Sequence, residues 1–245
     1  MIYLTSDWHG NVNGLNNFVD SIDTKTSLTK DDIVIILGDV GIMYGNYVME
    51  DLRKVMTKYP CTFFIMRGNH DKRYYKYAVE HPERFVFESR WGNDVCYDKQ
   101  YPNIIYARDD AAIYIIDDIK FLLIPGAYSV DKNYRIMNNM PWEKDEQLTK
   151  EELAAAVNLA WNNDIDIILS HTGPLQFQEK MKDLLLDYVI EPDNRMEEIM
   201  DLIYYTVGQN IDWYWGHFHG IRDFNDNAHL IYQQAVCVNK EKYNG

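Results

Sequence analysis

The sequence predicts an α/β protein with a largely parallel sheet, and two observations carry this prediction. Ile33–Leu37 is a continuous apolar run rich in β-branched residues, the kind of strand that a parallel sheet buries on both faces. It is separated from strand-like runs on either side by segments whose apolar residues recur at helical spacing. This alternation of strands and helices implies right-handed crossovers between parallel neighbours.

The first half of the chain supplies five elements in that order. A short strand is expected at Ile2–Thr5, and a helix over Asn11–Asp20 follows it. After the strand at Ile33–Leu37, a second helix is expected over Tyr47–Lys58. The apolar run Cys61–Met66 is the third strand.

The second half of the chain changes character. Strand-like runs at 104–106, 111–116 and 120–124, the last two joined by Asp117 and Asp118, predict an antiparallel meander. Helices and strands then alternate again. The expected elements are a helix capped by Thr149, a strand at 165–169, a helix over 195–205, a strand at 211–215, and a closing pair at 230–232 and 235–238 that completes the sheet.

A long irregular stretch, residues 125–149, precedes the helix capped by Thr149. A loop of that length inside a compact domain is uncommon unless it works as a lid or a binding loop. It carries Tyr128, Arg135 and Trp142, and an arginine beside flat aromatic rings can hold a phosphate and stack a base. A loop that simply packs on the surface is the alternative, and both interpretations stay open at this point.

Composition is that of an ordinary globular protein, with 47% hydrophobic and 25% charged residues. No apolar run is long enough to cross a bilayer, and the first residues lack the pattern of a secretory signal, so we expect a cytoplasmic protein. The formal net charge of -14 would repel a phosphate backbone, which argues against tight binding to duplex nucleic acid. It does not exclude a phosphate substrate, because bound divalent cations can reverse the local charge.

Three cysteines, Cys61, Cys96 and Cys237, are far apart in the chain. An odd number of cysteines among apolar neighbours suits small buried side chains in a reducing compartment better than a disulfide framework. No Cys-x-x-Cys pair occurs, so a cysteine metal site is not expected.

Polar residues at the ends of the expected strands are nearly all of metal-ligand type. In an open α/β sheet, ligands bind beyond the carboxyl ends of the strands, so residues distant in sequence converge there. Histidine and carboxylate without thiolate suit Mn, Fe, Zn or Ni at a catalytic site, and the set is large enough for two ions that share one carboxylate. The residues are Asp7, His9, Asp39, Asn69, His70, Asp71, His171, His217 and His219.

The order of these blocks resembles the calcineurin-like metallophosphoesterase superfamily. The blocks are Asp7-x-His9, Gly38-Asp39, Gly68-Asn69-His70-Asp71, His171 and Gly216-His217-x-His219, and they span nearly the whole chain. Any one of them would be a weak signal, whereas all five in the family order are not expected by chance. The resemblance implies a four-layer α/β/β/α sandwich of two mixed β-sheets flanked by helices. We take residues 1–245 as a single domain of this type.

The resemblance also implies a role for each of these residues. Two divalent metal ions, with Mn the first choice, would activate a bridging hydroxide that attacks the phosphorus. His70 would stabilise the scissile phosphate or protonate the leaving oxygen, and Asp71 would orient its imidazole. Asn69 is also a candidate for contacting the substrate, as are Tyr128 and Arg135 because of their place in the long loop. Asp7, His9 and His219 would bind one metal, Asn69, His171 and His217 the other, and Asp39 both.

The subclass is left open by the sequence. Protein phosphatases of the superfamily carry Asp-Arg-Gly shortly after the Gly-Asp block, whereas Val40-Gly41-Ile42 follows here. The expected function is therefore hydrolysis of a small phosphate mono- or diester or a nucleotide. A single-strand nuclease or a nucleotide phosphodiesterase is the alternative. A non-catalytic scaffold is disfavoured because every ligand position is filled.

Overall fold

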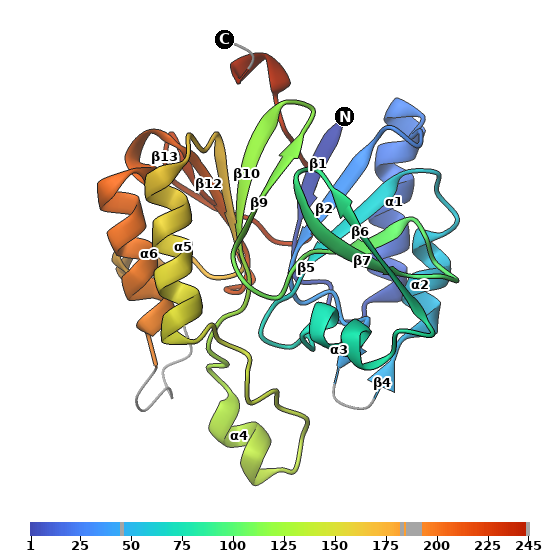
Figure 1. Cartoon of the computed structure of the whole chain (residues 1–245), viewed down its shortest axis with the longest axis horizontal. Coiled ribbons are helices and arrows are strands. Elements are labelled where there is room, and N and C mark those ends of the chain that lie inside the picture. The colour runs from blue at the N-terminus through green and yellow to red at the C-terminus, as the bar shows by residue number, and fades with distance from the viewer. Residues whose placement is uncertain (45–46, 182–183, 185–192, 244–245) are drawn as a thin grey trace.

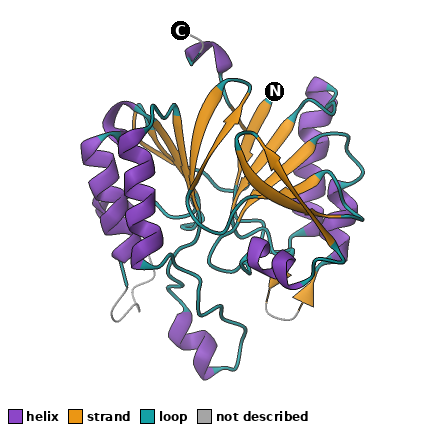
Figure 2. Cartoon of the chain, viewed as in Figure 1, coloured by secondary structure: helices purple, strands orange, loops and turns teal. Residues whose placement is uncertain are grey.

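Two β-sheets pack face to face, and helices cover the outer face of each (Figures 1 and 2). The computed structural model describes residues 1–44, 47–181, 184 and 193–243. Within this part of the chain, the layers follow one another as helices, sheet, sheet and helices. No helix in the described ranges combines the length and the apolarity that crossing a membrane requires.

The first sheet has the strand order β15-β1-β2-β5-β8-β7-β6. Its four central strands run parallel, and antiparallel strands complete both edges. The central strands are β1 (Ile2–Thr5), β2 (Ile33–Leu37), β5 (Thr62–Met66) and β8 (Ile104–Tyr106), and the edges are β15 (Val236–Cys237), β7 (Asn93–Asp98) and β6 (Phe85–Arg90).

The second sheet has the order β13-β14-β12-β11-β10-β9. Here too the central strands are parallel, with an antiparallel strand at each edge. Its strands are β9 (Ala112–Ile116), β10 (Ile119–Ile124), β11 (Ile167–Ser170), β12 (Asp212–Trp215), β13 (Arg222–Asn225) and β14 (Ala228–Leu230).

Helices on the outer faces complete the sandwich (Figure 2). Three helices pack on the first sheet and two on the second. The first group is α1 (Val12–Thr26), α2 (Glu50–Met56) and α3 (Tyr74–Glu80), and the second is α5 (Lys150–Asn162) and α6 (Arg195–Thr206). Smaller elements are the ribbon of β3 (Met43–Tyr44) and β4 (Tyr47–Val48), helix α4 (Lys132–Met137), and the 3-10 turns η1 (Leu175–Met181), η2 (Gly208–Asn210) and η3 (Lys240–Lys242).

The alternating directions of successive side chains in the buried strands explain why there are two helical layers. In β2, Ile33, Ile35 and Leu37 belong to the core between the sheets, whereas Val34 and Ile36 pack with the helices. Successive side chains of a strand point to opposite faces, so an all-apolar strand must be covered on both. The predicted four-layer α/β/β/α sandwich of two mixed sheets is therefore confirmed.

Several predicted boundaries were wrong. The helix expected from Tyr47 begins at Glu50, because Tyr47–Val48 pair with β3 instead. The meander reduces to the hairpin of β9 and β10, since the strand at 104–106 joins the first sheet parallel to β5. The hairpin of β6 and β7 and helix α3 were not predicted. Loop 125–149 contains helix α4, which extends away from both sheets (Figure 1).

The expected closing pair divides between the two sheets. Strand β14 lies beside β12 in the second sheet, and β15 lies antiparallel to β1 in the first. The chain crosses between them next to the strand ends: Ile231 N donates to Trp215 O at 2.8 Å, and Gln233 N donates to Ser6 O at 3.1 Å. Cys237 on β15 is exposed, which corrects the expectation that all three cysteines are buried.

Candidate metal centre

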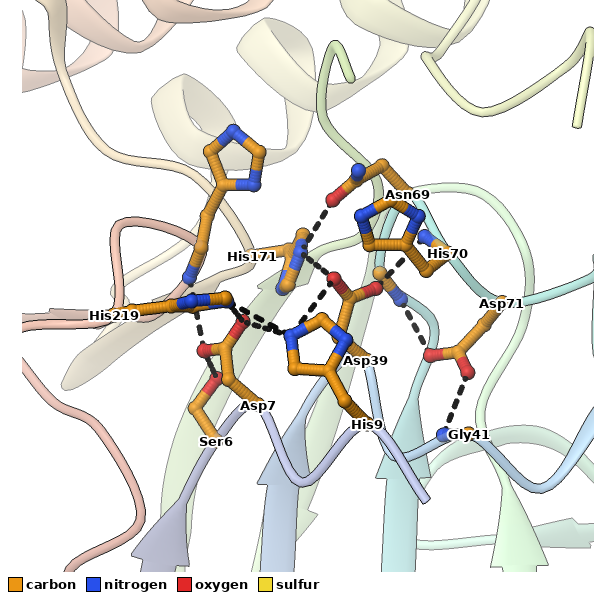
Figure 3. A network of polar contacts seen from close by, with 12 residues as sticks. Ser6, Asp7, His9, Asp39, Gly41, Asn69, His70, Asp71, His171 and His219 are labelled. Carbon is orange, nitrogen blue, oxygen red and sulfur yellow. Dashed lines mark hydrogen bonds and ion pairs between the residues drawn. The ribbon is translucent and has the colours of Figure 1, made fainter. Parts of the chain in front are cut away.

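The candidate ligands lie where the parallel strands of the two sheets end side by side (Figure 3). In the first sheet they follow the adjacent strands β1, β2 and β5, and in the second sheet they follow the adjacent strands β11 and β12. Asp7 and His9 follow β1, Asp39 follows β2, Asn69 and His70 follow β5, His171 follows β11, and His217 and His219 follow β12.

One group of donor atoms forms around Asp7. Its Oδ1 atom lies 3.7 Å from His9 Nε2 and 3.6 Å from His219 Nε2, and these two imidazole nitrogens are 2.8 Å apart. The other carboxylate oxygen, Oδ2, accepts from the hydroxyl of Ser6 and from His217 N. Oδ1 is buried and has no hydrogen-bond partner. A buried oxygen without a partner, aimed at two imidazole nitrogens, is what a cation site requires.

A second group forms around His171. Its Nε2 lies 2.9 Å from Asn69 Oδ1 and 3.4 Å from Asp39 Oδ2. Its Nδ1 is 2.6 Å from Leu37 O, and since a carbonyl only accepts, Nδ1 carries a proton, which leaves Nε2 as the nitrogen that could bind a cation. Asp39 Oδ2 is also 3.7 Å from His9 Nε2, so this carboxylate lies between the two groups.

His217 lies beside the second group. Its ring centroid is 5.2 Å from that of His171. It lines the same cavity as Asp39 and Asn69. The structure therefore brings all seven predicted metal ligands together, although His217 is not within the tight groupings of donor atoms that the other carboxylates and imidazoles form.

The backbone at these positions is unusual. Asp7, His9, Asp39, His217 and His219 have positive φ angles of 61°, 46°, 51°, 70° and 50°. Such angles are uncommon outside glycine and cluster at functional sites, where the surrounding fold must hold them. Gly68 is needed for a different reason, because a Cβ atom there would lie 2.1 Å from Asp39 Oδ1.

The electrostatics of the cluster favour added positive charge. Burial alone would raise the pKa of Asp39, but His171 and His70 bring the pKa well below its usual range. Burial would lower the pKa of His171, but Asp39 and Asp7 outweigh it and raise that pKa to about 9. Burial and the neighbouring His171 lower the pKa of His217 to about 3. Buried carboxylates that draw protons onto a nearby imidazole would be satisfied equally well by cations.

His70 and Asp71 are placed differently from each other. His70 N donates to Asp39 Oδ1 at 2.8 Å, and its imidazole lines the open side of the cluster. The carboxylate of Asp71 accepts instead from Gly68 N at 3.0 Å and Gly41 N at 3.2 Å (Figure 3). No hydrogen bond joins Asp71 to the imidazole of His70 in the described part of the chain. This corrects the expected contact: Asp71 ties two loop backbones together.

Two cavities open on the cluster. The metal-side cavity, about 320 Å³, is lined by Asn69, Asp131, His217 and His219 among others. The Tyr44 cavity, about 530 Å³, is lined by Gly41, Tyr44, Met49 and Met140. His9, Asp39, His70 and Arg135 line both cavities.

Of the two loop residues expected to contact substrate, the structure brings only Arg135 to the site. It lines both cavities and is held by Asp131, whose Oδ2 lies 2.7 Å from Arg135 Nε. Tyr128 lines neither cavity, and its ring lies 5.6 Å from Lys132 Nζ. The two residues differ in position, because Arg135 is on helix α4 whereas Tyr128 precedes that helix.

Loop 125–149 also supplies a buried chain of hydrogen bonds that the sequence did not reveal. Asn69 Nδ2 donates to Ser129 Oγ at 2.9 Å, and that hydroxyl donates to Glu146 Oε2 at 2.5 Å. Glu146 also accepts from Ser129 N at 3.0 Å and from Trp142 Nε1 at 2.7 Å. We call Asn69, Ser129, Glu146 and Trp142 the Asn69 chain. Serine and glutamate in a loop carry no motif, so no sequence signal pointed to them.

Fold and site together define a class: a four-layer α/β/β/α protein with hard and borderline metal donors gathered at the strand ends of both sheets. The donor set fits divalent cations, because it combines carboxylate, amide and imidazole atoms with one unpartnered buried oxygen. The chain belongs to the calcineurin-like phosphoesterase family, whose model matches residues 1–220.

Comparisons with individual proteins are distant. No curated protein matches the chain. Among solved structures, an archaeal phosphodiesterase is 12% identical, with a TM-score of 0.38 over 94% of this chain and 81% of that one. A protein of unknown function from Aquifex aeolicus is 17% identical, with a TM-score of 0.34 over 71% of this chain and 80% of that one. The sulfate thiohydrolase SoxB of Thermus thermophilus is 10% identical, with a TM-score of 0.38 over 92% of this chain and 38% of that one.

Proposed function

We propose that this protein hydrolyses a phosphate mono- or diester with the help of two divalent cations. The observation that supports it best is the convergence of carboxylate, amide and imidazole donors from five strand ends on one place. Asp7, His9 and His219 would hold one cation, Asn69, His171 and His217 the other, and Asp39 would contact both. Mn is the first choice among Mn, Fe, Zn and Ni, since the donors include no thiolate.

Bound cations would supply Lewis-acid chemistry, neutralising phosphate charge and making a water molecule more acidic. The rest is done by the chain itself. The hydrogen bond from His171 Nδ1 to Leu37 O turns Nε2 toward the place where a cation would bind. The positive φ angles aim the side chains that follow β1, β2 and β12 at one another. Little reorganisation is then needed when the cations and the substrate bind.

His70 is our candidate for the group that acts on the leaving side of the phosphate. Its imidazole lines both cavities, and its backbone N–H is fixed on Asp39 at 2.8 Å. In that position it could stabilise the scissile phosphate or give a proton to the leaving oxygen. Asp71 would support it indirectly, by holding Gly68, two residues before His70, against the loop at Gly41.

Two alternative functions compete with this proposal. A single-strand nuclease or a nucleotide phosphodiesterase would share its metal chemistry, and the net charge of -14 argues against tight binding to duplex nucleic acid. A scaffold without activity would keep only the fold. A cytoplasmic location and a single domain over residues 1–245 remain part of the proposal.

The experiment combines metal analysis with hydrolysis. The purified protein should contain or take up two divalent cations per chain, measured by elemental analysis. With Mn added it should hydrolyse 4-nitrophenyl phosphate or its bis ester, and Asp39→Asn should abolish both properties. A protein that binds no divalent cation and stays inactive with Mn, Fe, Zn and Ni would contradict the proposal and favour the scaffold.

A further inference from the structure

The two cavities meet at the same side chains, which bears on the kind of ester that fits. Both are lined by His9, Asp39, His70 and Arg135, so a phosphate placed against these residues has room on two sides. A phosphomonoester carries one organic group and can occupy only one of the cavities. A phosphodiester carries two groups and can occupy both.

The walls of the two cavities differ in chemistry. Beyond the shared residues, the Tyr44 cavity is lined by Gly41, Tyr44, Met49 and Met140, none of which is charged at neutral pH. The metal-side cavity adds Asp131 with imidazole and amide groups, beside the apolar side chains of Val130, Leu184 and Phe218. Thioethers make favourable contacts with aromatic rings, and a tyrosine ring offers an edge or a face for stacking. The Tyr44 cavity therefore suits a flat, weakly polar group, whereas the mixed lining of the metal-side cavity also suits a polar one.

Hydrogen bonds hold the wall at Tyr44 in place without a ligand. Tyr44 OH donates to Pro141 O at 2.8 Å and accepts from Arg135 Nη1, so both capacities of the hydroxyl are used inside the protein. The Tyr44 ring lies edge-on to His70, with centroids 5.8 Å apart. What remains for a ligand is the apolar surface of the ring. A wall built in advance also lowers the cost of ordering on binding.

Arg135 is placed to hold the phosphate between the two groups. Its Nε and Nη1 atoms are engaged by Asp131, Tyr44 and Pro141, and no described residue accepts a hydrogen bond from its Nη2. The guanidinium nevertheless lines both cavities. A planar guanidinium with a free N–H edge is well suited to a phosphate oxygen.

We propose that the Tyr44 cavity is the subsite for a planar aromatic ester group, and that the substrate is a phosphodiester carrying one such group. This inference rests on the proposed function, because the phosphate must sit at the metal centre. It goes further in naming the ester class and the wall that selects it.

The test compares ligands that differ only in the organic group. Phenylphosphonate and methylphosphonate cannot be hydrolysed, and their affinities for the Mn-loaded protein are measured by calorimetry. We expect the phenyl compound to bind at least about tenfold more tightly, since an apolar pocket discriminates by that order for even small groups. Met140→Gln should remove most of this preference. Met137→Gln is the matched control, because Met137 is on the same segment, is 81% exposed and lines neither cavity.

A second pair, the non-hydrolysable methylene phosphonate analogues of adenosine 5′-monophosphate and ribose 5-phosphate, separates a nucleobase from a simple aryl group as the occupant. If the adenosine compound binds more tightly than the ribose compound, and Met140→Gln again reduces the difference, the Tyr44 cavity holds a nucleobase. If only phenylphosphonate is preferred over its methyl counterpart, the Tyr44 cavity holds an aryl group. In hydrolysis, the bis ester of 4-nitrophenyl phosphate should be the better substrate than the monoester.

The inference is overturned if neither pair shows a preference, if Met140→Gln and Met137→Gln behave alike, or if the monoester is the better substrate. These results leave the proposed function standing as long as some ester is hydrolysed with Mn. Absence of hydrolysis of every ester, with no metal bound, would instead refute the proposed function itself.

Discussion

Glu146→Gln should weaken one of the two candidate metal sites and spare the other. The carboxylate of Glu146 accepts three hydrogen bonds, from Ser129 N, the Ser129 hydroxyl and Trp142 Nε1. Because the hydroxyl proton points to Glu146, Ser129 Oγ is left to accept from Asn69 Nδ2, and Asn69 Oδ1 faces His171. The carboxylate thus decides which end of the Asn69 amide is directed at the candidate metal site beside His171.

Glutamine has the same shape but offers one acceptor oxygen and an NH₂ group. At least one of the three donors would then face another donor. If the NH₂ group meets Ser129, the hydroxyl is free to turn toward Asn69, and the amide has reason to flip and present Nδ2 to the metal. Losing an outer hydrogen-bond partner of a ligand typically costs about 10- to 100-fold in metal affinity. That range corresponds to about 1.4 to 2.7 kcal/mol.

The assay is Mn titration followed by calorimetry or electron paramagnetic resonance, which yields two dissociation constants. We expect the constant of the site that contains Asn69 to rise by about 10- to 100-fold in Glu146→Gln, while the site of Asp7, His9 and His219 stays within about threefold. Glu143→Gln is the control, because it removes the same charge from the same loop. Equal weakening of both sites, or wild-type affinity at both, would refute the reasoning.

Three further outcomes are expected. His70→Ala should keep both metals by elemental analysis while its turnover falls by about 10²- to 10⁴-fold, and parallel loss of metal would contradict its role. Gly68→Ala should lose metal, since its Cβ would lie 2.1 Å from Asp39 Oδ1, and full metal content would show that the loop adapts. Burial raises the pKa of Glu197 to about 7, so the stabilisation by its neutral form is complete below about pH 4.5 and is lost as the pH rises through 7. Chemical denaturation should show the wild type losing about 3 kcal/mol more than Glu197→Gln between pH 4.5 and pH 8.5, and parallel curves would contradict the assignment.

The strands, and the side chains that gather at their ends, could be predicted because both leave strong local signals. A continuous apolar run such as Ile33–Leu37 must be buried on both faces, and the acid that follows it must then lie at the sheet edge. The family model over residues 1–220 and the four observed layers agree with that interpretation. The order of the five motif blocks predicted which side chains would meet, although the blocks lie far apart in the chain.

What the sequence could not predict depends on contacts between distant segments. The strand at 104–106 pairs with β5 instead of with its neighbours in sequence, and nothing within three residues can encode that choice. Asp71 follows His70 directly, yet its carboxylate is satisfied by Gly68 and Gly41. In the same way, Ser129 and Glu146 acquire their importance only because loop 125–149 folds back onto Asn69.

The positive φ angles at five of the candidate ligand positions have a practical consequence for mutagenesis. Aspartate, asparagine and histidine are among the few side chains that enter this backbone region readily, whereas alanine there costs about 1 to 2 kcal/mol per residue. An alanine scan of Asp7, His9 or Asp39 would therefore measure a lost donor and a strained main chain together. Asparagine at the two aspartates avoids the strained main chain, because it tolerates the same torsion angles while it replaces the charged carboxylate by an amide. The main chain itself thus limits which residues can replace a ligand at this edge of the sheets.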